Sequence, residues 1–151
     1  MWFYNKKIIS SIEQLPDWER LCGFVYSIEC TQKGPLLGKK YFGKKNFFTR
    51  TKKALTKKEL TTDKRLKIYK HVVKESNWLS YYGSNAALKA DVLSIGATKF
   101  HREILGLAYS VKELTFLELE LQIINNVLRS DHCYNENIAG NYFRRDLIRK
   151  I

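Results

Sequence analysis

Two tyrosines and a group of cations lie close together near the start of the chain. Tyr26 belongs to one short apolar run, Tyr41 belongs to a second, and Gly43 follows directly. The cations that come next are Lys44, Lys45 and Arg50. Hydrolysis of a phosphodiester needs cations for the developing phosphate charge, a carboxylate to hold a metal ion, and a group that positions or deprotonates water. Phenols can position water, and we expect the surrounding positive charge to lower their pKa.

The carboxylate would come from a long helix predicted over residues 111–128. Leucine and isoleucine recur there at intervals of three and four residues, which is the strongest helical pattern in the chain. Two glutamates are candidates for the metal ligand. On a helical projection Glu118 lies with Gln122 and Asn125 on the polar edge, and Glu120 falls nearer the apolar face. The helical pattern alone leaves both glutamates open.

The elements that must position these side chains predict an α+β fold. Residues 23–30 and 39–42 flank a loop that contains Gly34-Pro35 and Gly38, which indicates a β-hairpin. Alternation over residues 100–107 predicts a third strand, so we expect a small three-stranded mixed or antiparallel sheet flanked by helices. Ser84 is expected to cap a helix over residues 85–94 that Gly96 ends. A short helix or pair of turns is expected within residues 11–21.

A basic tract connects the hairpin to this helix. Between Lys39 and Lys74 the sequence has 14 lysines and arginines and only two acidic residues, Glu59 and Asp63. A capping-box pattern at residues 56–59 predicts that residues 44–75 form a basic insertion with one or two helices laid over the sheet. The residues expected to bind nucleic acid are Lys44, Lys45, Lys52, Lys53, Lys57, Lys58 and Arg65.

Composition bounds the class of protein. The chain has 151 residues, which predicts a single domain, and a formal net charge of +12, which favours a polyanionic partner. Its three cysteines fit neither a zinc site nor a disulfide framework, so a reducing compartment is expected. No stretch has the length of a signal peptide or of a membrane span. We expect a soluble, cytoplasmic protein with no membrane partner and with a basic tail over residues 140–151.

The motifs together resemble the GIY-YIG nuclease family. The first motif resembles Phe24-Val25-Tyr26 and the second resembles Tyr41-Phe42-Gly43. The later segments WLSYYGSN at 78–85 and FHREIL at 100–105, the glutamate-bearing helix, and Tyr134-Asn135 are similar to the phage-encoded branch related to free-standing homing endonucleases. The resemblance covers about residues 22–139. It departs from the family pattern at Phe24, where the first glycine would stand, although Gly23 is adjacent.

The resemblance implies a DNA endonuclease that uses one divalent metal ion, Mg²⁺ or Mn²⁺, and no small-molecule cofactor. It implies that Tyr26 and Tyr41 are the active-site tyrosines, and it leaves open which of the two is the base. It also implies that Arg50 contacts the scissile phosphate. It also implies that Glu118 binds the metal and that Asn135 braces the site, with Lys45 adding a phosphate contact. Arg65, or the pair Lys67 and His71, are alternatives to Arg50.

A second class of function fits the composition as well. A basic accessory protein that binds nucleic acid without cutting it would need only the cations. Both tyrosines, the helix glutamate and the asparagine favour the endonuclease, acting as a homing enzyme or against host or competitor DNA. We expect a monomer or a homodimer.

Overall fold

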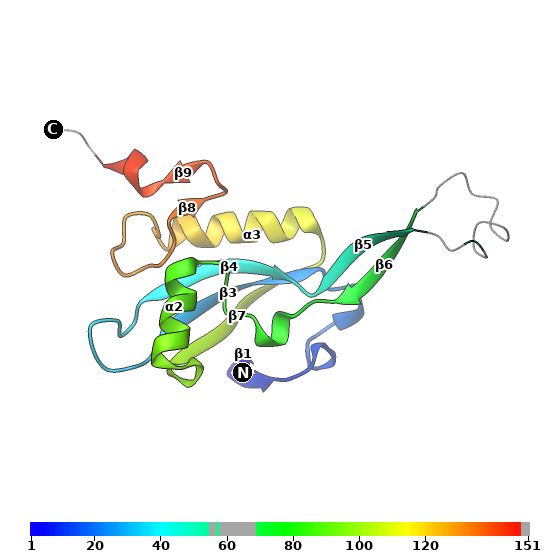
Figure 1. Ribbon diagram of the computed structural model, residues 1–151, viewed down its shortest axis with the longest axis horizontal. Helices are drawn as coiled ribbons and strands as arrows, with labels where there is room; N and C mark the ends of the chain where they lie inside the picture. Colours follow the sequence, from blue (N-terminus) through cyan, green and yellow to red (C-terminus); the bar gives the residue numbers. More distant parts are fainter. Residues whose placement is uncertain (55–56, 58–68, 149–151) are drawn as a thin grey trace.

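The centre of the protein is a five-stranded mixed sheet with the strand order β2-β1-β7-β3-β4. The computed structural model describes residues 1–54, 57 and 69–148 (Figure 1). The strands of this sheet are β1 (Trp2–Tyr4), β2 (Lys7–Ile9), β3 (Gly23–Cys30), β4 (Lys40–Asn46) and β7 (Phe100–Ala108). Strands β1 and β7 are parallel, and the other neighbours are antiparallel. The α+β class, the hairpin of β3 and β4, and the strand at β7 are therefore confirmed.

The prediction of three strands was wrong because an N-terminal hairpin adds two more. Strands β1 and β2 have three residues each, and their turn uses Asn5 and Lys6 at φ values of 47° and 66°. No glycine marks this turn, so the usual local signal for a hairpin is missing. The hairpin joins the core through Trp2, whose ring is fully buried and whose Nε1 donates to the Trp78 carbonyl at 2.7 Å.

The sheet separates two layers (Figure 1). Helix α3 (Val111–Ile124) covers one face, where Leu114 packs with Val25. The other face is covered by α2 (Ala86–Ile95) and by the 3₁₀ turns η1 (Ile12–Gln14), η2 (Trp18–Arg20) and η3 (Trp78–Ser80). The larger core lies on that face and contains Phe24 and Tyr26, which alternate with Val25 because successive strand residues point to opposite faces.

Both long helices form, with small changes at their ends. Helix α2 is capped by Asn85, not by Ser84, and the Asn85 side chain accepts from the Leu88 amide at 3.0 Å. It ends at Gly96 as predicted. Helix α3 ends at Ile124, four residues earlier than predicted, and Asn126 then adopts a left-handed φ of 52°. The turn brings Leu128 against Phe42 of β4, where it is buried.

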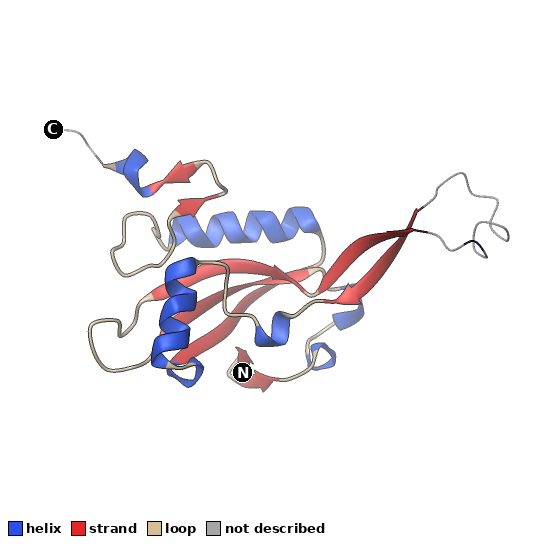
Figure 2. Cartoon of the chain, in the orientation of Figure 1, coloured by secondary structure: helices blue, strands red, loops and turns tan. Residues whose placement is uncertain are grey.

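The basic insertion is a correction to the predicted fold. Its described residues form a two-stranded antiparallel ribbon of β5 (Phe48–Ala54) and β6 (Tyr69–Glu75), drawn as strands in Figure 2. Val72 and Val73 lie in β6. β-Branched residues such as Thr49, Thr51 and this valine pair favour extended chain. Apart from Lys57, the predicted capping box at residues 56–59 lies outside the described residues.

The chain closes with a small hairpin of β8 (Asn137–Ile138) and β9 (Tyr142–Phe143), followed by η5 (Arg144–Leu147). Among the described residues no helix combines the length and the apolar character that crossing a membrane requires.

Candidate functional site

Tyr41, Glu118 and Asn135 line one cavity of about 430 Å³ at the outer edge of β4. Tyr41 lies on β4, Glu118 on α3, and Asn135 on the segment before β8. The other lining residues are Ser84, Asn85, Gln122, Glu136, Asn137, Ala139 and Gly140. Three of the residues expected to form an active site are thus brought together from distant parts of the sequence.

Gly43 explains why the two tyrosines lie close together. It stands opposite Tyr26 in the register of β3 and β4. A Cβ atom at Gly43 would be 2.7 Å from the Tyr26 hydroxyl and 2.9 Å from Cε1 of Tyr41, so only glycine leaves room for both rings. The ring centroids of Tyr26 and Tyr41 are 6.1 Å apart. Tyr26 is only 1% exposed, so it supports the site from beneath, and Tyr41 faces the cavity.

The electrostatic environment of the tyrosines contradicts the sequence-based expectation. Burial raises the pKa of Tyr26 well above its usual value, and the neighbouring phenols of Tyr41 and Tyr81 raise it further. Burial also raises the pKa of Tyr41, although its hydrogen bond to Ser84, at 3.2 Å, acts in the opposite direction. The prediction of lowered pKa values was therefore wrong. Desolvation is the largest influence on the pKa of each phenol, and both keep their protons at neutral pH.

The cations beside the tyrosines have other immediate partners. Lys45 places its Nζ 4.2 Å from the centre of the Tyr81 ring, and partial burial lowers the pKa of its amine. Lys44 donates from Nζ to the Thr115 hydroxyl of α3 at 3.1 Å. Lys44 also acts on Glu118, since its charge and its backbone amide both lower the pKa of that carboxyl.

Of the two candidate glutamates of α3, Glu118 lines the cavity and Glu120 does not. Burial is the largest influence on Glu118 and raises the pKa of its carboxyl despite Lys44. Glu120 is exposed and is not among the lining residues. One turn after Glu118, the buried Gln122 donates from Nε2 to the Phe42 carbonyl at 3.0 Å, which fixes this face of α3 against β4. The helical projection was wrong about Glu120, because it placed this residue nearer the apolar face, whereas in the fold Glu120 is exposed and Glu118 is half-buried.

Asn135 closes the edge of β4 as an additional strand residue would. Its Oδ1 accepts from the Phe42 amide at 3.1 Å, and its Nδ2 donates to the Phe42 carbonyl at 2.8 Å. The preceding residues pair by backbone: the Lys40 amide donates to His132 at 3.0 Å, and the Tyr134 amide donates to Lys40 at 2.7 Å. Asn135 is 3% exposed, so its amide satisfies a buried edge and holds the backbone between Tyr41 and Gly43.

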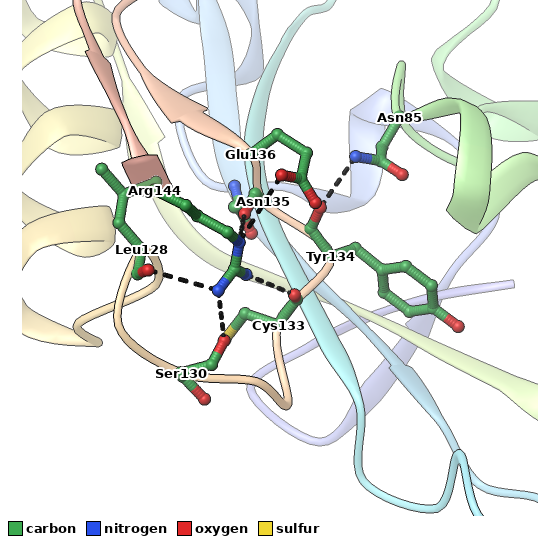
Figure 3. A network of polar contacts seen from close by, with 8 residues as sticks. All are labelled: Asn85, Leu128, Ser130, Cys133, Tyr134, Asn135, Glu136 and Arg144. Carbon is green, nitrogen blue, oxygen red and sulfur yellow. Dashed lines mark hydrogen bonds and ion pairs between the residues drawn. The ribbon is translucent and has the colours of Figure 1, made fainter. Parts of the chain in front are cut away.

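Arg144 holds the segment that carries Asn135 (Figure 3). Its guanidinium donates to four backbone carbonyls, at distances from 2.6 to 3.2 Å, and its Nε lies 3.7 Å from a carboxylate oxygen of Glu136. The four carbonyls belong to Leu128, Ser130, Cys133 and Asn135. On the other side of the segment, Asn85 donates from Nδ2 to the Tyr134 carbonyl at 2.8 Å. An arginine of the predicted basic tail is therefore an internal cross-link.

The donors of the cavity fit a hard divalent cation. Glu118 and Glu136 supply carboxylates, and the amide side chains and hydroxyls supply further oxygens. Within the described residues no group of three histidines, cysteines, aspartates or glutamates is close enough to hold a metal. An ion at Glu118 would therefore keep several water ligands, as Mg²⁺ does at sites with one or two carboxylates.

Arg50, the arginine predicted to contact the scissile phosphate, does not line the cavity. Arg50 is exposed on β5, opposite Val73 of β6, and does not line the cavity. Lys52 and Lys53 follow it on β5. Lys57 is exposed, and its neighbours on both sides in the sequence lie outside the described residues. Lys58, Arg65 and the alternative Lys67 lie outside the described residues, whereas His71 lies on β6 opposite Lys52. Among the described residues that line the cavity with Glu118, Arg50 and Lys57 are not found.

Several cavity residues were not predicted. Ser84 and Asn85 end the segment WLSYYGSN, whose resemblance to the family gave a signal, but only their role in capping was considered. Gln122 could have been found from its spacing of four residues after Glu118. Tyr81, which contacts Lys45 and Tyr26 outside the cavity, also belongs to the segment WLSYYGSN. Glu136 had no signal beyond its position directly after Tyr134-Asn135.

A comparison with protein-family models identifies one family. A family model described as the GIY-YIG domain of endonuclease segE matches residues 2–138. No curated protein and no solved structure matches the chain. The matched range contains the N-terminal hairpin, both tyrosines, Glu118 and Asn135. Because this range spans most of the chain, the protein belongs to the SegE GIY-YIG family and is an endonuclease.

Proposed function

We propose that this endonuclease hydrolyses phosphodiester bonds of DNA in the cavity at the edge of β4, with one Mg²⁺ or Mn²⁺ bound at Glu118. The observation that carries the proposal is the convergence of Tyr41, Glu118 and Asn135 on that cavity. When bound, the divalent ion supplies charge stabilisation for the phosphate and a water ligand of lowered pKa.

Each residue has a separate task in this proposal. Tyr41 keeps its proton and orients the attacking water through its hydroxyl, because burial raises its pKa. Tyr26 packs against the ring of Tyr41 and against the backbone of β4 at Gly43, and so holds both in place. Lys44 and Lys45 lie on the same strand as Tyr41 and attract the phosphate backbone. Asn135 fixes the backbone next to Tyr41 through its paired bonds to Phe42.

Arg50 has a different task from the one inferred from the family resemblance. Its exposed position on β5, outside the cavity, suits a contact with DNA beyond the cleaved bond. Lys44 and Lys45 lie on the same strand as Tyr41, and Lys44 already acts on the Glu118 carboxyl. We assign the charge that faces the scissile phosphate to these lysines together with the metal ion.

The carboxylates of the cavity favour cleavage over simple binding. A protein that only held a polyanion would gain nothing from Glu118 and Glu136 facing the phosphates, because like charges repel. A divalent cation between carboxylate and phosphate reverses that interaction. The arrangement therefore favours the endonuclease over the accessory binding protein.

Plasmid cleavage tests the proposal. Purified protein is expected to nick or cut supercoiled plasmid with Mg²⁺ or Mn²⁺ and to stop when the metal is chelated. Glu118→Gln should reduce the rate by at least about 10²-fold, since it removes the metal-binding carboxylate, while DNA binding in the absence of metal changes little.

Glu120→Gln is the matched control, because this glutamate is exposed two residues away and does not line the cavity. It is expected to cut at the wild-type rate. Full activity of Glu118→Gln, or equal loss in both variants, would contradict the assignment of the site.

A further inference from the structure

Strands β5 and β6 form a ribbon that extends away from the five-stranded sheet (Figure 1). Its base is anchored by Phe47, whose ring is fully buried. The Phe47 amide donates to the Cys22 carbonyl at 3.0 Å, and the Ser76 amide donates to the Phe47 carbonyl at 2.8 Å. The direction of the ribbon is therefore fixed relative to β4 at the point where the two strands leave the core.

The ribbon concentrates positive charge without a matching negative charge. Its two strands contain five lysines and arginines and one acidic residue, Glu75. The Glu75 carboxylate accepts from Nε1 of Trp78 at 2.8 Å, at the end of the ribbon next to the core. The strand register sets Lys53 opposite Lys70 and Lys52 opposite His71.

Cations occupy both faces of the ribbon. Neighbouring positions of a strand alternate between faces, and Lys74 pairs with Thr49, so Arg50 and Lys74 belong to opposite faces. Both residues are exposed, and Val73 beside them is 59% exposed. A partner that surrounds the ribbon with negative charge on two sides, and offers some apolar contact between, fits this distribution best.

We propose that this ribbon enters the major groove of duplex DNA, within about one helical turn of the bond that is cut. The major groove is about 12 Å wide, admits a two-stranded ribbon, and is bordered on each side by a phosphate backbone. The location of the cut in this proposal rests on the proposed function of the cavity, and the groove contact itself does not.

The spacing follows from the strands. Tyr41 of β4 and Arg50 of β5 are nine residues apart in a chain that is extended except at Phe47. At about 3.3 Å per residue, this stretch spans at most about 30 Å. One turn of B-DNA is about 34 Å long. DNA with a phosphate at the cavity would therefore meet the base of the ribbon within about one turn.

Binding without metal tests the ribbon separately from cleavage. Fluorescence anisotropy would follow a labelled duplex of about 30 base pairs, nearly three turns, across a range of salt concentrations. The double variant Arg50→Gln with Lys74→Gln is expected to lose about tenfold in affinity and to lower the salt slope by about 2, because each phosphate contact contributes about 0.9.

The double variant Lys7→Gln with Lys99→Gln is the control. It removes the same formal charge from exposed positions on β2 and just before β7. It should change the affinity by less than about threefold, as expected for long-range charge alone. Equal losses in the two double variants would overturn the proposal, because net charge would then explain the binding.

Methylation of guanine N7, a major-groove atom, tests the groove. Wild-type protein is expected to bind the methylated duplex more weakly than the unmethylated one, and the ribbon variant should not distinguish them. Wild-type binding that ignores the methyl groups would rule out insertion into the major groove. Because these measurements need no metal and no cutting, a failure of cleavage leaves them interpretable, and a failure of groove binding leaves the cavity assignment intact.

Discussion

Glu118, the proposed metal ligand, is partly buried at a cost in folding stability. Its carboxyl is desolvated by the packing of α3 on β4, and the charge and amide of Lys44 compensate only in part, so its pKa stays raised. A carboxyl with a raised pKa favours the protonated form in the folded protein. At neutral pH the ionised group therefore lowers the free energy of unfolding, and a bound cation would recover it.

Glu118→Gln is expected to unfold at a higher temperature than wild type at pH 7.5 without metal. The neutral amide removes the buried charge, and the benefit should disappear near pH 4, below the usual glutamate pKa of about 4.3, where wild type is protonated both folded and unfolded. Thermal unfolding followed by circular dichroism at the two pH values would measure this. A lower unfolding temperature for Glu118→Gln at pH 7.5 would show that the ionised carboxylate is already well paired.

Gly43→Ala should destabilise the protein by about 1–3 kcal/mol, the usual cost of overpacking. Its Cβ atom would lie 2.7 Å from the Tyr26 hydroxyl. Tyr26→Phe removes that oxygen, so the double variant should be less destabilised than the sum of the two single changes. Urea unfolding of the four proteins measures the coupling. Additive losses would mean that the clash lies elsewhere, for example at Tyr41.

At the scale of elements, the edge of β4 determines the site. The Asn135 amide, the Gln122 amide and the backbone of residues 132–134 satisfy successive groups of β4. Arg144 then fixes the segment through four carbonyls. The end of the chain thereby positions Asn135, and Asn135 positions the backbone beside Tyr41.

Arg144→Ala is expected to accelerate hydrogen exchange at the Phe42 amide, which donates to Asn135 in the wild type. Loss of the guanidinium leaves its carbonyl partners without a donor and frees the segment from Leu128 to Asn135 to move. Arg145→Ala is the control, because Arg145 contacts only the Phe143 ring among the contacts seen for it, at 4.8 Å. Unchanged protection of Phe42 in Arg144→Ala would show that Asn135 is held without the arginine.

The sequence allowed the elements with clear patterns to be predicted. Alternating apolar residues around a Gly-Pro loop located β3 and β4, and leucine periodicity located α3. The ribbon of β5 and β6 has no such alternation, because most of its described side chains face solvent. The local helix signals therefore led to the wrong prediction of helices in this segment. The turn at Asn5 and Lys6 likewise lacks glycine, so the N-terminal hairpin gave no local signal.

The site was predictable only in part for a similar reason. The motifs located Tyr41, Glu118 and Asn135 through their resemblance to a family. The pKa of Tyr26 could not be inferred, since it depends on burial by Trp2, Phe24 and Tyr81, which comes from tertiary packing. Arg144 is one of several basic residues near the end of the chain, and its internal bonds are not visible in the sequence.

On the scale of the whole molecule, a cavity with two carboxylates lies within a protein of net charge +12. The positive surface attracts a polyanion, and the local negative charge at Glu118 and Glu136 attracts a divalent cation. The two preferences meet where a phosphate, a metal ion and the Tyr41 hydroxyl can be adjacent. Our central claim is that cleavage takes place where these three groups meet.

Paramagnetic broadening by Mn²⁺ in NMR spectra of the free protein tests that claim most directly. Substoichiometric Mn²⁺ is expected to broaden first the side-chain amide signals of Asn135 and Gln122 and the backbone amide of Glu118, and Glu118→Gln should abolish the effect while Glu120→Gln preserves it. Broadening centred on another part of the protein, or broadening that persists in Glu118→Gln, would contradict the account.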